Sequence, residues 1–184
     1  PAVFNATPTA RAGGGNSKNG AFNAVVHFGG YTPPGANAVN NVEHYDGSSW
    51  TEIADLNTGR PGTGAAAGAP VTDTVAFGGY AGPPFTPQVI TEKWDGSSWT
   101  EVNDMNYGRS GGYGGTVSSG YFSGGSSAPW SRAEEWDGST WSEATAFGER
   151  NGDVGGCSPT QVYGIGSFYD GGAKFVKYNA SSAA

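Results

Sequence analysis

The stretch Glu43-His-Tyr-Asp-Gly-Ser-Ser-Trp50-Thr-Glu52 decides the fold of this 184-residue chain, because the chain repeats it. It returns as Glu92-Lys-Trp-Asp-Gly-Ser-Ser-Trp99-Thr-Glu101, and again as Glu134-Glu-Trp-Asp-Gly-Ser-Thr-Trp141-Ser-Glu143. Each copy runs on to an arginine, and a further arginine lies near the N-terminus. Spaced 49, 49 and 41 residues apart, these are Arg11, Arg60, Arg109 and Arg150. A period of this size is typical of a stacked or circular array of one small unit.

Each unit predicts four short strands. In the second unit these are a small-residue run over 62–69, then 74–79, 89–94 and 99–102. The segments are rich in β-branched and aromatic residues and are bounded by Gly, Pro, Asn and Ser, as strands usually are. Asp95-Gly96 lies between the last two, where a hairpin needs the positive φ that glycine adopts at little cost. No segment keeps a helical apolar period, so the sequence predicts an all-β protein.

The composition agrees with this prediction. The chain has 33 Gly and 11 Pro, yet aromatic residues make up 13% of it and recur periodically, unlike those of a disordered chain. Small residues allow inner strands to crowd near an axis, while large aromatics fill the wider gaps between outer strands. A radial stack of sheets requires this taper.

The order of arginine, small-residue strand, strand ending in Gly-Gly, Tyr or Trp strand, turn and Trp resembles the kelch repeat of β-propellers. The Gly-Gly element stands at 29–30, 78–79 and 124–125, and Gly166-Ser167 replaces it in the fourth unit. The motif Asp-Gly-Ser-Ser-Trp-Thr-Glu also resembles the tandem kelch-like repeats of marine bacteriophage and environmental virus proteins. The resemblance covers essentially the whole chain and implies a propeller.

The two ends of the chain predict how the ring closes. Residues 1–11 have the register of residues 50–60, an outer fourth strand, and residues 174–182 have that of a third strand. Pairing them in one blade would satisfy both edges. We therefore expect one domain over 1–184, a four-bladed kelch-like β-propeller with the N- and C-terminal strands closing one blade. Its units are 12–60, 61–109, 110–150, and 151–184 plus 1–11. A longer parent chain, or two chains sharing a larger ring, is the alternative.

The charge and the cysteine content limit the kinds of partner and the location that we expect. The formal net charge is −7 and the pI is near 4.6, and an acidic chain without a basic stripe repels phosphate backbones. We expect no nucleic-acid partner and no membrane insertion, since no apolar run approaches spanning length. No signal peptide is visible, although a chain that begins at Pro1 has no initiator Met. The single Cys157 cannot form an internal disulfide, which neither supports nor excludes an extracellular protein. Because phage particles assemble in a reducing cytoplasm, stability without disulfides weakly favours a viral protein.

The search for catalytic residues is negative. His27 and His44 have no Cys or acidic cluster at metal-ligand spacing, and the glycine runs match no phosphate loop. No Gly-x-Ser-x-Gly elbow lies between a strand and a helix. Some copper oxidases use kelch-like propellers, but no Tyr, Cys and His constellation supports that chemistry here. We expect no enzyme, no cofactor and no metal, with a propeller enzyme as the weakest alternative.

For the tryptophans and arginines that recur in each unit, a structural role is favoured over a binding role. Trp50, Trp99 and Trp141 fall at equivalent positions and are expected to pack between blades. Arg11, Arg60, Arg109 and Arg150 are expected to donate to backbone carbonyls of neighbouring blades, and a ring of guanidinium groups around a central anion is the less favoured alternative.

The connections between second and third strands vary most, and they combine proline with aromatic residues. In a propeller these connections would lie on the same face as the arginines. Rigid aromatic residues there can bind a sugar or a protein patch at low entropic cost. The proposed contact residues are Tyr31, Tyr80, Phe85, Trp130 and Tyr169. Loops that merely cover blade edges are the competing interpretation.

These features favour a non-enzymatic binding or structural module of a phage particle, such as a tail-fibre, spike or decoration domain. Its partners would be other virion proteins or a host surface glycan, and its location the virion. A secreted carbohydrate-binding lectin or adhesin is the alternative. The sequence leaves the oligomeric state open, a homo-oligomer included.

Overall fold

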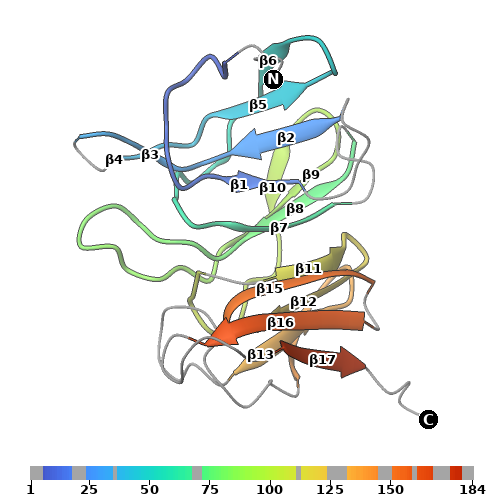
Figure 1. The fold of residues 1–184 in the computed structure, drawn as a ribbon. Helices are drawn as coiled ribbons and strands as arrows, with labels where there is room; N and C mark the ends of the chain where they lie inside the picture. Colours follow the sequence, from blue (N-terminus) through green and yellow to red (C-terminus); the bar gives the residue numbers. More distant parts are fainter. Residues whose placement is uncertain are drawn as a thin grey trace.

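The computed structural model describes residues 6–17, 24–34, 37–67, 72–110, 113–123, 132–144, 151–158, 161–167 and 175–179. Regular structure in these residues consists of β-strands alone, and the described residues contain no helix (Figure 1). The all-β prediction is confirmed. The strands form four larger antiparallel sheets and one two-stranded ribbon.

The first two sheets are four-stranded meanders in which neighbours in sequence pair in order. The first contains β1 (Gly15–Asn16), β2 (Val25–Phe28), β5 (Val42–Tyr45) and β6 (Trp50–Ile53). The second contains β7 (Gly64–Ala67), β8 (Thr74–Phe77), β9 (Thr91–Trp94) and β10 (Trp99–Glu101). The ribbon of β3 (Tyr31–Thr32) and β4 (Asn37–Ala38) extends the connection between β2 and β5. Corresponding residues pair alike, since Tyr45 faces Trp50 and Trp94 faces Trp99.

The third and fourth sheets repeat the same order. The third contains β11 (Tyr113–Thr116), β12 (Ser119–Ser123), β13 (Ala133–Trp136) and β14 (Trp141–Ala144). The fourth contains β15 (Asn151–Ser158), β16 (Gln161–Ser167) and β17 (Phe175–Asn179). Among the described strands, none pairs with the outer edge of β17. The predicted partner segment around Val3 and Phe4 lies outside the described residues, so closure through the termini stays a prediction.

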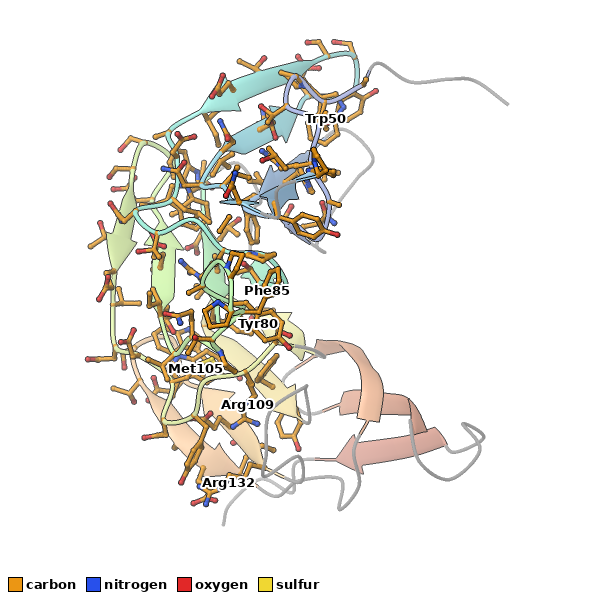
Figure 2. All side chains as sticks on the ribbon, turned by 90° about the vertical axis from the view of Figure 1, so that its left-hand side faces the viewer. Trp50, Tyr80, Phe85, Met105, Arg109 and Arg132 are labelled. Atoms are coloured by element: carbon orange, nitrogen blue, oxygen red, sulfur yellow. The ribbon has the colours of Figure 1, made fainter. Side chains whose placement is uncertain are left out.

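The first strands of the sheets connect one sheet to the next. β7 lies against β1 and β11, and β11 lies against β15. The sheets thereby follow one another along an arc, with the first and the fourth at its two ends (Figure 2). All four residues of β7 are small, since the strand reads Gly-Ala-Ala-Ala, and the absence of bulky side chains lets neighbouring backbones approach.

Two apolar clusters hold the first three sheets together. Between the first and second sheets, the buried residues are Val26, Phe28, Val42, Leu56, Ala76, Trp94 and Trp99. Between the second and third, they are Val75, Phe77, Met105, Val117, Phe122, Trp136 and Trp141. In each cluster one sheet supplies mainly aliphatic residues and a phenylalanine, and the next supplies two tryptophans. The core is therefore divided into equivalent layers between sheets.

The Asp-Gly turns join the last two strands of the first three units. In the second unit the Asp95 carboxylate accepts hydrogen bonds from the backbone N–H groups of Ser97 and Ser98, both at 2.8 Å. Gly96 has a φ of 98°, as the hairpin prediction requires. The N–H of Ser98 and then that of Ser97 lower the pKa of Asp95 to about 2. Asp46 and Asp137 have pKa values lowered by the same kinds of bond.

Candidate functional site

A buried ion pair joins each of the first three units to the segment that precedes it. In the second unit, Arg60 Nη1 donates to Glu92 Oε1 at 2.5 Å, and both side chains are fully buried. Nη1 also donates to the backbone oxygen of Thr58, while Nε and Nη2 donate to those of Gly78 and Ala76. A buried charge is costly unless it is paired and hydrogen-bonded, and here both conditions hold.

The carboxylate of Glu92 is bonded on its other side by an asparagine. Asn57 donates its backbone N–H at 2.7 Å and its side-chain amide at 2.9 Å to Glu92 Oε2. In the third unit Asn106 bonds Glu134 in the same way, at 2.7 and 2.8 Å, and Arg109 Nη2 donates to Glu134 at 2.6 Å. The sequence Asn-x-x-Arg thus binds the Glu of the following unit.

The first unit keeps the ion pair but lacks the asparagine. Arg11 Nη2 bonds Glu43, and the residue three positions before Arg11 is Pro8, which has neither a backbone N–H nor an amide. Arg11 Nε, Arg11 Nη1 and Glu43 Oε1 are buried without a hydrogen-bond partner among the described residues. Burial lowers the pKa of Arg11 to about 10, against the raising effect of Asp55 and Glu52. This pair is the least satisfied of the three.

Sequence reasoning missed these glutamates. The available signal was in the repeat, because Glu43, Glu92 and Glu134 open its three copies. A glutamate that recurs at one position of three equivalent strands indicates a fixed partner. In the fourth sheet, the strand register places Val176 where Glu92 stands in the second, since Val176 faces Gly164 two residues before Gly166. Arg150 itself lies outside the described residues.

The repeated tryptophans differ in what covers them. Trp99 is 5% exposed and donates its indole N–H to the Ala54 backbone oxygen at 3.0 Å. Trp141 is 7% exposed and donates to Thr91 Oγ1 at 2.9 Å. Both acceptors belong to the preceding unit. Trp50 is only partly buried, and its indole N–H has no acceptor among the described residues.

Two of the predicted contact residues, Tyr31 and Tyr80, occupy equivalent positions at the start of the variable connections. The Tyr31 N–H donates to the Ala12 oxygen, and the Tyr80 N–H donates to the Pro61 oxygen, both at 2.9 Å. Each ring lies over a glycine, Gly13 or Gly62, where even a Cβ atom would come within 3.1–3.4 Å of neighbouring atoms. Both tyrosines are partly buried. The structure therefore gives them a packing contact with the linking segment as well as an exposed part.

Phe85 is the exposed member of the predicted set. It is the large apolar side chain with the greatest exposure among the described residues, at 41%. Its ring meets that of Tyr80 edge to face, with centroids 6.2 Å apart (Figure 2). The loop is tight, because Phe85 N–H donates to the Gly82 oxygen and Ala81 N–H donates to the Thr86 oxygen. Phe85 adopts a φ of 58°, which is uncommon for a bulky residue.

The other two predicted contact residues, Trp130 and Tyr169, lie outside the described residues. Directly after the third connection, Arg132 stacks on Tyr107, with its guanidinium carbon 3.7 Å from the ring centroid. The Arg132 side chain is 33% exposed. A partly exposed cation on an aromatic ring was not predicted, since the two residues lie in different segments of the repeat.

Some kinds of site are absent from the part of the chain that the structure describes. No cluster of three or more His, Cys, Asp and Glu side chains could hold a metal ion there. In those same ranges, no helix has the length and apolarity needed to cross a membrane.

Burial, and then the charge of Arg11, lower the pKa of His27 to about 4. A neutral His27 beside the first ion pair follows at ordinary pH.

No protein-family model matches this chain, and no curated protein matches it.

Proposed function

We propose that the chain is a non-enzymatic binding module with a kelch-like β-propeller architecture, belonging to a phage particle as a tail-fibre, spike or decoration domain. The exposed Phe85 in its tight proline-rich loop is the observation that carries the binding role. A phenylalanine with 41% exposure and positive φ gains little from folding beyond its one ring contact with Tyr80. Strained residues of this kind cluster at binding sites.

The scaffold beneath the loop supports a preorganised contact surface. Tyr80 is anchored on the linking segment through the Pro61 oxygen and in turn contacts Phe85. Rigid aromatic residues give contact area at a low conformational-entropy cost, and aromatic anchors dominate many interfaces. Two partners fit such a surface: a neighbouring virion protein, or a host glycan that stacks on the rings. A secreted lectin or adhesin with the same face is the second candidate, supported by the same aromatic residues.

The propeller part of the proposal is supported by the four consecutive sheets, by the two equivalent apolar layers between the first three of them, and by the contacts between their first strands. A ring requires the first and last blades to meet. One chain can close it as four blades by pairing residues 1–11 with β17, or two chains can share a larger ring.

The experiment compares the unaltered protein with the variant Phe85→Ser, Trp130→Ser on glycan arrays and in pull-downs from purified particles. We expect an unchanged fold, because surface substitutions usually shift the free energy of unfolding by about 0.5 kcal/mol or less. We expect weaker attachment to the partner. Thr100→Ala, on an exposed position of β10, is the matched control and should bind normally. Unchanged binding by the double variant would remove this face as the site, and a collapsed fold would show that core was mistaken for contact surface.

A further inference from the structure

The third unit carries a cation stacked on an aromatic ring, and the first two units lack this pair. The guanidinium carbon of Arg132 lies 3.7 Å from the centroid of the Tyr107 ring. In the second unit, the repeat register gives these two positions to Ile90 and Thr58. Neither position holds a cation or an aromatic residue in the first unit either. Since two equivalent units fold without the stacked pair, the scaffold does not require it.

Both residues of the stacked pair are held through the backbone by Arg109. Arg109 Nη1 donates to the Arg132 oxygen at 2.7 Å, and Nε donates more weakly to the Tyr107 oxygen at 3.5 Å. Arg109 is buried and bound to Glu134. The pair therefore lies on a fixed, buried ion pair. A side chain that is positioned before a ligand arrives binds it at a lower entropic cost.

The charge of Arg132 is accessible to solvent. Its side chain is 33% exposed, and within the described part of the chain its ion-pair partner is Glu143, 4.0 Å away and 65% exposed. An exposed ion pair at this distance contributes little. Stacking uses the face of the guanidinium and leaves the N–H groups in its plane for another acceptor. Arg132 can therefore offer two parallel donors to a carboxylate.

The stacked pair lies beside the connection that carries Phe85. The residue after Tyr107 is a glycine that lies against Pro87, since a Cβ atom there would be 2.7 Å from the Pro87 oxygen. Pro87 pairs with Tyr80, whose ring contacts that of Phe85. Figure 2 shows Phe85, Tyr80 and Arg132 following one another along this side of the molecule. The exposed ring and the exposed cation thus belong to neighbouring segments of one surface.

We propose that this surface binds an acidic glycan, in which a sugar carboxylate binds Arg132 and the C–H faces of the sugars contact Tyr80 and Phe85. The negative face of an aromatic ring attracts such C–H groups. An acidic protein surface would bring several carboxylates toward a chain with a net charge of −7, and would be repelled. A glycan can present one carboxylate to one arginine. This inference rests on the proposed binding function and names its ligand class.

The test is a glycan array in which each carboxylate-bearing glycan stands beside the same glycan with its carboxylates converted to amides. We expect the unaltered protein to bind acidic glycans at least about 10-fold more tightly than their amides, because the amides lose the charge-assisted hydrogen bonds. Equal binding to the two forms, or no binding to any acidic glycan, overturns the proposal.

Variants identify the residue responsible. Arg132→Gln should weaken binding to acidic glycans by at least about 10-fold, because it removes the charge. Lys93→Gln is the matched control, since it removes a positive charge from another side chain that is 40% exposed, and it should bind normally. Equal effects of the two substitutions, or undiminished binding by Arg132→Gln, contradict a specific site at Arg132.

A double variant separates loss of the site from loss of the fold. Arg132→Ile, Tyr107→Thr gives the third unit the residues that the second unit has at these positions, so it should fold with a melting temperature close to that of the unaltered protein. It should also lose the preference for acidic glycans over their amides. A folded double variant that keeps this preference overturns the proposal.

This inference and the proposed function fail separately. If the protein binds a virion protein through Phe85 but binds no acidic glycan, the inference fails and the proposed function stands. The same holds if Phe85→Ser, Trp130→Ser abolishes binding to glycans that are bound equally well as acids and as amides. Loss of binding in Arg132→Gln but not in that double serine variant supports the site at Arg132 and removes Phe85 from the contact surface.

Discussion

Arg60 and Glu92 lie 32 residues apart in sequence, yet their side chains form a fully buried ion pair with a nitrogen–oxygen distance of 2.5 Å. Arg60 comes from the segment that links the first and second sheets, and Glu92 from β9. The pair therefore fixes the linker against the sheet that follows it. Two equivalent ion pairs, Arg109 with Glu134 and Arg11 with Glu43, occur in the neighbouring units. The units are therefore joined by buried ion pairs as well as by apolar layers.

Glu92→Ala should lower the free energy of unfolding by about 3–5 kcal/mol, because it leaves the guanidinium of Arg60 buried without its carboxylate. Urea denaturation followed by tryptophan fluorescence measures the change. Glu101→Ala, at an exposed position of β10, is the control and should stay within about 0.5 kcal/mol of the unaltered protein. Equal effects of the two substitutions would show that the ion pair does not stabilise the fold.

Pro8→Asn should stabilise the protein, because it restores at the first ion pair the donors that Asn57 and Asn106 supply to the other two. Glu43 Oε1 is buried without a hydrogen-bond partner among the described residues, so new bonds to it should add about 1 kcal/mol to the free energy of unfolding. Asn57→Pro is the reciprocal variant and should destabilise the second unit. Thermal melting should show a higher melting temperature for Pro8→Asn and a lower one for Asn57→Pro. A loss of stability in Pro8→Asn would contradict the equivalence of the three linkers.

The three Asp-Gly turns should make stability depend on pH in the acidic range. The pKa of Asp95 in the folded state is about 2, below the ordinary value of about 3.9. A carboxyl whose pKa is lowered on folding stabilises the fold above its unfolded pKa, and this contribution is lost as the pH falls toward the folded value. We therefore expect the urea midpoint to fall from pH 4 to pH 2, and to fall less in the variant Asp46→Asn, Asp95→Asn, Asp137→Asn. Parallel pH profiles would show that these turns do not carry the dependence.

The sequence predicts the parts of this fold that depend on local chemistry. Asp95-Gly96 specifies a hairpin turn through its own backbone preferences, and Gly96 has the positive φ expected of it. The period of the repeat likewise predicts four consecutive sheets. The partner of Arg60 depends on how a linker folds onto the next sheet, so spacing alone did not identify Glu92. Nor could equivalence in sequence show that Trp50 differs from Trp99, because burial depends on what lies on the other side of the interface.

The sequence predicted which connections carry the candidate contact surface, but not how exposed each of its side chains is. Proline and aromatic residues mark the variable connections, and Tyr80 and Phe85 do lie together there. Their exposure could not be read from the sequence, since Tyr31 and Tyr80 are partly buried against the linking segment while Phe85 points outward. The stacking of Arg132 on Tyr107 was missed for a similar reason, because it joins residues of two separate segments.

Phe85→Gly should separate stability from binding. Phe85 holds a φ of 58°, which costs a residue with a side chain about 1–2 kcal/mol and glycine almost nothing. The substitution also removes the edge-to-face contact with Tyr80, worth about 0.5–1.5 kcal/mol, so the free energy of unfolding should stay within about 1 kcal/mol of its original value. Attachment to the partner should nevertheless weaken, as the exposed ring is gone. Phe77→Gly, in the buried core, is the contrast and should cost at least about 3–5 kcal/mol. Urea denaturation and the pull-down assay measure the two effects, and a large loss of stability in Phe85→Gly would assign Phe85 to the fold rather than to a contact surface.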